Sequence, residues 1–248
     1  MNKILFLDIE TFPNIAYVWG KYQQDVIRYT QQSCIATYAA KWQGGKVFAG
    51  SLPEFDNYVP GSYDDSKLID QLWALLDEAD IVVAHNGDNF DVRTCKARFV
   101  FHGMTPPSPF RTVDTKKVAK SVGRFNSNAL NDLGDLLFND KKIKTDFDLW
   151  QGCINGDKKS WNQMVRYNKK DVLLLEKLYL RLLPWIPNHP NQAVSGKPSC
   201  PKCGSQNIMY KGYRCTQTRQ YRQFVCRHCG GWSRVVRCEP TGKKVTTN

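Results

Sequence analysis

The sequence lacks long apolar segments. No run approaches the roughly 20 consecutive apolar residues that a helix needs to cross a bilayer, and Ile4–Leu7, near the start of the chain, is too short for the hydrophobic part of a secretory signal. Internal repeats are absent as well. We therefore expect a cytoplasmic protein that has no membrane partner.

Acidic residues are scarce in the C-terminal part of the chain. Residues 197–248 hold eleven lysines and arginines against a single acid, Glu239, and so supply +10 of the formal net charge of +12. Residues 1–196 are nearly balanced at +2. A basic segment of this kind favours a polyanionic partner, nucleic acid before a membrane surface, although it can also serve solubility alone.

Cysteine is scarce outside two close pairs. Of the nine cysteines, Cys34, Cys95 and Cys153 are scattered along the chain, and we expect them to be buried as small apolar side chains in a reducing compartment. Cys215 and Cys238 also fall outside the pairs. They are expected to be spare thiols, since nothing in the sequence indicates export.

The two pairs have the spacing of a zinc site. Cys200 and Cys203 form one C-x₂-C knuckle, Cys226 and Cys229 form another, and each knuckle is followed by glycine. Four thiolates in this pattern can surround one Zn²⁺ ion tetrahedrally. The sequence thus predicts one structural zinc ion, and disulfides are the alternative for an exported protein.

The segment between the knuckles predicts a β-hairpin with strands at residues 210–216 and 221–225, and this order of elements resembles zinc ribbons. Cationic and aromatic side chains alternate here, namely Tyr210, Lys211, Tyr213, Arg214, Arg219, Tyr221, Arg222, Phe224, Trp232, Arg234 and Arg237. Cations for phosphates and rings for stacking suit single-stranded nucleic acid. The alternatives are that several rings form the module's core and that the surface docks another protein.

Apolar periodicity in the rest of the chain predicts a mixed α/β sheet with helices on its faces. Apolar, β-rich runs predict strands at residues 3–7, 16–19, 33–41, 46–50 and 81–84, with Gly44-Gly45 as a hairpin turn. Helical patterns fall at residues 66–77, 91–101, 128–138 and 160–183, the last with Ser160 as N-cap and Pro184 as stop.

Proline marks a boundary between two domains. Pro184, Pro187, Pro190 and Pro198 lie close together, with Ser195 and Gly196 among them, a composition typical of a linker. We expect a first domain at residues 1–186, a linker at 187–196 and a zinc ribbon with a basic tail at 197–248. A unit of about 50 residues buries little core, so a metal is expected to stabilise it.

Carboxylates follow the first predicted strand. In Asp8-Ile9-Glu10 the two acids lie two residues apart, so a strand would project both to the same face. Two like charges on one face repel each other unless a cation lies between them. A strand end that faces solvent is the alternative. A further acid, Asp114, is expected to cap a helix.

Two more polar motifs follow later in the chain. Residues 85–91, His-Asn-Gly-Asp-Asn-Phe-Asp, come directly after the strand at 81–84, where α/β sheets commonly build sites. A helix cap is the alternative for this segment. Tyr167 and Asp171 lie four residues apart in the long predicted helix and would therefore share one face.

Together, and in this order, the three segments resemble the exonuclease motifs of the DEDD superfamily, whose fold is RNase H-like. Residues 6–11, Phe-Leu-Asp-Ile-Glu-Thr, match the D-x-E motif, and Asn86-x-x-x-Phe90-Asp91 matches the second motif. Tyr167-x-x-x-Asp171 matches the third in its tyrosine form. That form defines the DEDDy subgroup, which includes proofreading domains of family A and B DNA polymerases. The resemblance covers about residues 1–183.

The resemblance implies hydrolysis with two Mg²⁺ or Mn²⁺ ions. Asp8 would bridge both ions, and Asp91 would serve the second. Glu10 and Asp171 would complete the site that holds the attacking water. Hard cations prefer such oxygen ligands. Tyr167, with a reference pKa near 10, would orient the water by a hydrogen bond rather than take its proton.

Other motif residues are expected to contact the substrate. Thr11, Asn86 and Phe90 are the candidates, and a structural role in the loop is the alternative for Asn86 and for His85. Residues 125–128 loosely resemble a segment that contacts terminal nucleotides in such enzymes.

We therefore predict a two-metal 3′–5′ exonuclease that releases nucleoside monophosphates from single strands or 3′ ends, with DNA favoured over RNA. It would act alone or proofread for a separate DNA polymerase or replication protein. One alternative is a structure-specific endonuclease or ribonuclease with the same site. A non-catalytic nucleic-acid-binding protein is the alternative from another class, but such a protein needs no cluster of acids that are costly to desolvate.

Overall fold

The computed structural model describes residues 2–22, 24–140, 145–193 and 197–235. The chain folds as two compact units, one formed by Lys3–Tyr179 and the other by Leu180–Asn248 together with Met1–Asn2. The domain limits drawn from the sequence, 1–186, 187–196 and 197–248, stay predictions.

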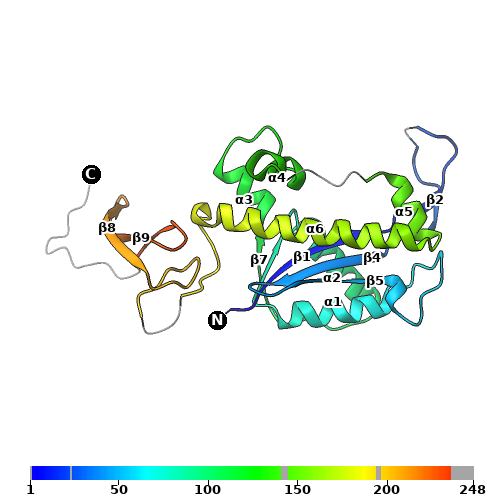
Figure 1. The fold of residues 1–248 in the computed structure, drawn as a ribbon, viewed down its shortest axis with the longest axis horizontal. Coiled ribbons are helices and arrows are strands. Elements are labelled where there is room, and N and C mark those ends of the chain that lie inside the picture. The colour runs from blue at the N-terminus through cyan, green and yellow to red at the C-terminus, as the bar shows by residue number, and fades with distance from the viewer. Residues whose placement is uncertain (1, 23, 141–144, 194–196, 236–248) are drawn as a thin grey trace. The chain divides into compact units, whose positions relative to one another are not determined.

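The larger unit is built on a five-stranded mixed sheet with the strand order β5-β4-β1-β6-β7 (Figure 1). The strands are β1 (Ile4–Thr11), β4 (Ile35–Trp42), β5 (Val47–Ser51), β6 (Ile81–Ala84) and β7 (Arg111–Asp114). β1 pairs antiparallel with β4 and parallel with β6, while β4–β5 is antiparallel and β6–β7 is parallel. β2 (Ile15–Tyr17) and β3 (Arg28–Gln31) form a separate two-stranded sheet.

Helices connect the strands and cover the sheet, which confirms the predicted mixed α/β architecture (Figure 1). They are α1 (Ser66–Glu78), α2 (Asp91–Phe101), α3 (Thr115–Val122), α4 (Leu130–Phe138), α5 (Phe147–Ile154) and α6 (Lys158–Leu182), with 3₁₀ turns η1 (Leu52–Glu54) and η2 (Leu183–Trp185). The four helices expected from the sequence are confirmed, whereas α3 and α5 were not predicted. Within the described residues, no helix has both the length and the apolar character that a membrane crossing requires.

The central strand β1 packs on both of its faces. Leu5, Leu7 and Ile9 are buried in one core together with apolar residues of α1 and α2. Phe6 points to the opposite face, where its ring lies edge-on against Tyr179 of α6, with 5.4 Å between the ring centroids. The strand therefore lies between two helical layers, as expected for an apolar run buried on both sides.

Helix α6 begins two residues earlier than the sequence pattern indicates, and the prediction of Ser160 as its N-cap is wrong. Asp157 precedes the helix, and its carboxylate accepts hydrogen bonds from the backbone N–H of Ser160 (2.9 Å) and from the hydroxyl of the same serine (2.7 Å). An aspartate here satisfies free N–H groups and places negative charge at the positive end of the helix. The helix ends at Leu182, before Pro184, as predicted.

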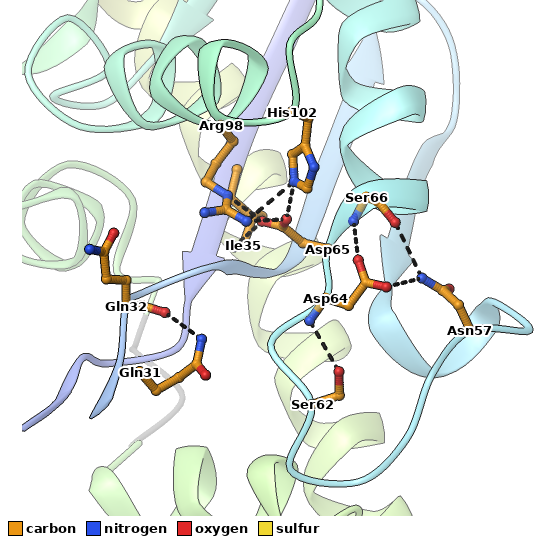
Figure 2. Close-up of polar contacts among 10 residues, drawn as sticks. All are labelled: Gln31, Gln32, Ile35, Asn57, Ser62, Asp64, Asp65, Ser66, Arg98 and His102. Carbon is orange, nitrogen blue, oxygen red and sulfur yellow. Dashed lines mark hydrogen bonds and ion pairs between the residues drawn. The ribbon is translucent and has the colours of Figure 1, made fainter. Parts of the chain in front are cut away.

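A buried carboxylate joins α1, α2 and β4 (Figure 2). Asp65 is fully buried and accepts hydrogen bonds from the backbone N–H of Ile35 (2.9 Å) and from two guanidinium nitrogens of Arg98 (2.8 and 2.5 Å). Nε2 of His102 lies 2.7 Å from the same carboxylate. Charge-assisted bonds of this kind offset the desolvation of the acid. Since Ile35 pairs with Thr11, the network also fixes the end of β1.

The smaller unit holds a three-stranded antiparallel sheet in the order β10-β9-β8. Its strands are β8 (Ile208–Cys215), β9 (Gln220–Cys226) and β10 (Trp232–Arg234), so the predicted hairpin is confirmed. β8 is exposed along nearly its whole length, whereas β9 buries Phe224 and Cys226. The apolar core of this sheet is therefore small.

The scattered cysteines are buried, as the sequence predicts. Burial raises the pKa of the Cys153 thiol to about 12 and also raises the pKa of Cys34 and Cys95, which keeps all three protonated and weakly reactive. Cys215 is exposed. Cys238 lies outside the described residues.

Candidate active site and cysteine cluster

Strand β1 presents two carboxylates on the face that looks toward α6. Asp8 and Glu10 alternate with buried apolar residues along the strand, so both project from the face that Phe6 occupies. That face is the one on which Phe6 contacts Tyr179 of α6. The strand bounds predicted from the sequence, 3–7, end before the acids, whereas pairing with β4 continues as far as Thr11. Both acids therefore project from the strand, as their spacing predicted.

Asp91 approaches the same strand from α2. It is the first residue of that helix, it is 2% exposed, and its Oδ1 accepts a hydrogen bond of 3.1 Å from the backbone N–H of Ile9. Because Ile9 lies between Asp8 and Glu10, this bond brings a third carboxylate beside the first two. The helix N-terminus also favours negative charge at this position.

The loop between β6 and α2 depends on an unusual backbone. Asn86 has a φ of 69°, in the left-handed region that asparagine adopts more readily than most residues. Gly87 follows at a point where a Cβ atom would lie 2.4 Å from the Cβ of Ala84. The Asp114 carboxylate accepts a hydrogen bond of 3.0 Å from the backbone N–H of Asn86 and two more from the first turn of α3. The predicted capping role of Asp114 is thus confirmed, and the same acid fixes the loop.

Helix α6 brings a tyrosine and a fourth acid to the cluster. Tyr167 and Asp171 are 8% and 7% exposed and lie one helical turn apart. Burial raises the pKa of Tyr167, and the nearby charges of Asp171 and Glu10 raise it further. The phenol therefore keeps its proton at neutral pH, so it can donate a hydrogen bond but cannot act as a base.

Asn168 is a residue of this site to which the sequence assigned no role. It is fully buried, and its Nδ2 donates hydrogen bonds to the backbone oxygen of Asp8 (3.1 Å) and to the Oδ2 atom of Asp8 (2.6 Å). Both partners are acceptors, so the NH₂ group must face them. The one available signal was its place beside Tyr167 in the third motif, and a sequence cannot show where that amide points.

The four acids share one electrostatic environment. Burial raises the pKa of Asp8 well above its usual range, and Asp91, Glu10 and Asp171 raise it further. Burial also raises the pKa of Asp91 to about 7, against the effect of its bond from Ile9. Such shifts arise where charged forms are both desolvated and repelled. The structure therefore brings together all five predicted catalytic residues, whose catalytic role stays a prediction.

The residues predicted to contact substrate lie on the segments that carry the acids: Thr11 follows Glu10, while Asn86 and Phe90 lie in the loop before Asp91. Thr11 lines a groove of about 480 Å³ together with Pro13, Thr145, Asp146, Phe147 and Trp150. Phe90 is 40% exposed and directly precedes α2. The Oδ1 atom of Asn86 accepts a bond of 3.4 Å from the side chain of Asn89. Their contact with substrate stays a prediction.

His85 is held by contacts within the fold. Its Nε2 lies 2.9 Å from the carbonyl oxygen of Asn128, and its Nδ1 lies 2.9 Å from the hydroxyl of Thr115. Burial lowers the pKa of the imidazole, so the neutral ring donates through Nε2 and accepts at Nδ1. These contacts join the loop to α3 and to the segment before α4, which favours the structural alternative for His85.

The second predicted site lies in the smaller unit. The sulfur atoms of Cys200, Cys203, Cys226 and Cys229 all lie within 4.8 Å of one another. The Cys200–Cys229 and Cys203–Cys226 sulfur pairs are each 3.7 Å apart, far beyond the roughly 2.05 Å of a disulfide bond. The four thiols are therefore clustered but not bonded to one another.

The two knuckles share one backbone geometry. The N–H of Gly204 donates to the oxygen of Cys200 (2.8 Å), and the N–H of Gly230 donates to the oxygen of Cys226 (2.9 Å). Both glycines have a positive φ, 71° and 76°, which explains why glycine follows each pair in the sequence.

The fold and the match of residues 49–183 define the class of this protein. These residues, more than half of the chain, match the RNase_H superfamily. The chain therefore belongs to that superfamily, and the expected RNase H-like fold is confirmed.

A solved structure has a similar fold. The family B DNA polymerase from the hyperthermophilic archaeon Pyrobaculum calidifontis matches 75% of this chain with a TM-score of 0.57 and 15% sequence identity. The chain spans only 25% of the length of that polymerase. A comparison with curated proteins gave no match.

Proposed function

We propose that this chain is a metal-dependent 3′–5′ exonuclease of the DEDDy type that acts on single strands or 3′ ends, DNA before RNA. The observation that carries the proposal is the convergence of four carboxylates and one tyrosine from β1, α2 and α6. Membership of the RNase_H superfamily and the order of the three motifs support it. A cytoplasmic location and a separate polymerase partner stay predictions.

The donor set suits hard divalent cations. Carboxylates are the ligands that Mg²⁺ and Mn²⁺ prefer, and positive charge would offset the repulsion that raises the pKa of Asp8. Such cations, when bound, lower the pKa of an attacking water and stabilise charge on the leaving 3′-oxygen.

The protein's own groups would divide the remaining work. Asp8, which Asn168 holds by a hydrogen bond, would contact both cations. Asp91 is fixed on one side by the Ile9 N–H. Tyr167 keeps its proton and would donate a hydrogen bond that orients the attacking water.

We also propose that the cysteine cluster holds one structural Zn²⁺ ion. Four sulfurs at about 2.3 Å from a tetrahedral zinc ion are about 3.8 Å from one another. Two of the sulfur pairs here are 3.7 Å apart, and all four sulfurs lie within 4.8 Å of one another. The surrounding unit is strongly basic and exposes Tyr210 and Tyr213. This unit would bind the phosphates of a single strand through its cations and the bases through its exposed rings.

The test compares two variants in the full chain. Asp8→Ala is expected to reduce Mg²⁺- or Mn²⁺-dependent cleavage of a fluorescent single strand to background, with little change in the Kd for that strand. Asp132→Ala removes an acid that is exposed on α4 and should cleave like the unmodified chain. If highly purified Asp8→Ala retained metal-dependent cleavage, the assignment of this site would be wrong.

A further inference from the structure

The ribbon formed by β2, β3 and the loop between them exposes a group of large apolar side chains. Its most exposed rings are Trp19 at 90% and Tyr22 at 74%. The others are Ile15, Tyr17, Val18, Val26, Ile27 and Tyr29, each between 43% and 57% exposed. An isolated two-stranded hairpin is only marginally stable in water, and a group of exposed large apolar side chains is typical of a binding surface.

Cations accompany the rings on this ribbon. The guanidinium of Arg28 lies 5.8 Å from the ring centroid of Tyr17, its partner across the strands. The ammonium of Lys21 lies 5.5 Å from the ring centroid of Tyr22. Rings with adjacent cations suit a partner that has both flat aromatic faces and negative charge. That chemistry describes a single-stranded nucleic acid better than an apolar protein surface.

The base of the ribbon is fixed to the sheet. The hydroxyl of Ser33 donates to the oxygen of Phe12 (2.6 Å), and the N–H of Ser33 donates to Oδ1 of Asn14 (2.7 Å). These bonds join the segment that follows β1 to the segment that precedes β4. The ribbon is therefore an extension of the strand that carries Asp8 and Glu10.

A groove lies between the end of β1 and α5. Thr11, the residue after Glu10, and Pro13, two residues before β2, line the groove of about 480 Å³, and Phe147 and Trp150 of α5 line it too. Phe147 is 60% exposed. The groove thus joins the residue next to Glu10 to the segment that leads into the ribbon, and aromatic side chains of α5 line it.

We propose that the β2–β3 ribbon binds the single strand on the 5′ side of the nucleotide that is cleaved. Bases stack on Trp19, Tyr22 and the neighbouring tyrosines, and phosphates contact Lys21 and Arg28. The inference rests on the proposed function, because it places the 3′ end at the carboxylates. Stacking on rings tolerates any base, so this surface would raise the affinity for the strand without a sequence preference.

The test measures strand binding as a function of strand length in the full chain. All proteins carry Asp171→Asn so that the bound strand is not cut, and fluorescein-labelled thymidine oligonucleotides of about 4 and about 16 nucleotides are the probes. Trp19→Ala and Tyr22→Ala should each weaken binding of the long probe roughly tenfold and leave the short probe unaffected. Val100→Ala, which truncates an apolar side chain of α2 that is 78% exposed and lies outside both proposed binding surfaces, should change neither.

The outcomes distinguish failure of the ribbon inference from failure of the proposed exonuclease function. Equal Kd values for Trp19→Ala, Tyr22→Ala and the control would overturn the inference and leave a protein partner as the occupant, even if the unmodified chain cleaves 3′ ends. An equal loss for short and long probes would also overturn it, because the effect would then arise at the active site. A loss confined to the long probe supports the ribbon, and cleavage by the unmodified chain is scored separately.

Discussion

Asn168 shows how a neutral side chain can organise a charged site. Its Nδ2 donates to two acceptors of Asp8, the backbone oxygen and the carboxylate. The carboxylate of Asp8 is thereby fixed in rotation even though three other acids repel it. A donor at this point also favours the charged form of Asp8, the form that binds a cation.

Removal of this amide should therefore impair the site. Asn168→Ala should lower the cleavage rate on the order of 10- to 100-fold, the usual effect of losing a group that orients a metal ligand, and should weaken Mn²⁺ binding measured by electron paramagnetic resonance. Asn168→Asp should be at least as damaging, since it replaces the donor with a fifth acid. The matched control is Asn162→Ala, an exposed asparagine on the same helix. Equal Mn²⁺ affinity in Asn168→Ala and Asn162→Ala would show that the amide does not position Asp8.

The raised carboxyl pKa values predict how stability depends on pH. The pKa of Asp91 is raised to about 7 by burial, against about 3.9 in an unfolded chain. Without divalent cations the folded chain therefore binds more protons than the unfolded chain between these values. Its free energy of unfolding should fall as the pH rises from about 4 to about 7.

The measurement is the Tm of the Mg²⁺-free protein across this range. Asp91→Asn should show a smaller fall than the unmodified chain, whereas the exposed-acid variant Asp132→Asn should match the unmodified chain. Added Mg²⁺ should restore more stability near pH 7 to the unmodified chain than to Asp91→Asn. Identical pH profiles for all three proteins would contradict the electrostatic description of the site.

Among the elements, the loop before α2 determines where Asp91 lies. The loop carries the left-handed Asn86 and the tightly packed Gly87, and the N–H of Val92 donates to the oxygen of Gly87 (2.9 Å). A parallel pairing of β6 with β1 places this loop at the edge of the sheet where Asp8 emerges. The position of Asp91 thus follows from the loop backbone as much as from the helix.

Gly87→Ala is expected to displace this loop. The added Cβ would lie 2.4 Å from the Cβ of Ala84, so the variant should lose about 1–3 kcal/mol of stability and much of its cleavage. Gly123→Ala is the control, because a Cβ there meets only ordinary contacts with Phe125. Unfolding in denaturant measures the first effect. Unchanged stability in Gly87→Ala would show that the loop tolerates a side chain.

Some helices and strands could be predicted from the sequence, and others could not. α2 and β6 were predicted with their observed bounds. β6 is a continuous apolar run of buried residues, and α2 begins at Asp91, directly after the polar loop that follows β6. β3 is almost entirely exposed, and β7 buries only its last two residues, so neither has an alternation to detect. Ser160 was misassigned because an N-cap is defined by hydrogen bonds, and Asp157 makes them.

For the whole molecule, the topology explains why distant residues meet. β1 lies in the middle of the sheet, α2 begins beside it, and α6 crosses the face to which its acids point. The order of motifs indicated this convergence for residues 8, 10, 91, 167 and 171. It gave no indication of the exposed ribbon after β1, since a short strand rich in tyrosine and tryptophan resembles a buried one.

The smaller unit allows a test of the zinc proposal. Cys226→Ser should lose bound zinc, lose protection of β8 and β9 from hydrogen exchange, and weaken single-strand binding with a shallower salt dependence. Cys215→Ser, which replaces an exposed cysteine of the same unit, should keep all three properties. Zinc content by mass spectrometry, hydrogen exchange and fluorescence anisotropy provide the readouts. A Cys226→Ser protein that retained one zinc ion per chain would contradict the proposed ligand set.

The most direct test of the central claim is product analysis on single strands labelled at either end, in the presence of Mg²⁺. An exonuclease that begins at the 3′ end should release labelled nucleoside monophosphate at once from the 3′-labelled strand and a descending ladder from the 5′-labelled strand. A blocked 3′ end should stop both reactions, and Asp171→Asn should abolish them. Internal cleavage of the blocked strand, or no Mg²⁺- or Mn²⁺-dependent product from the unmodified chain, would contradict the account.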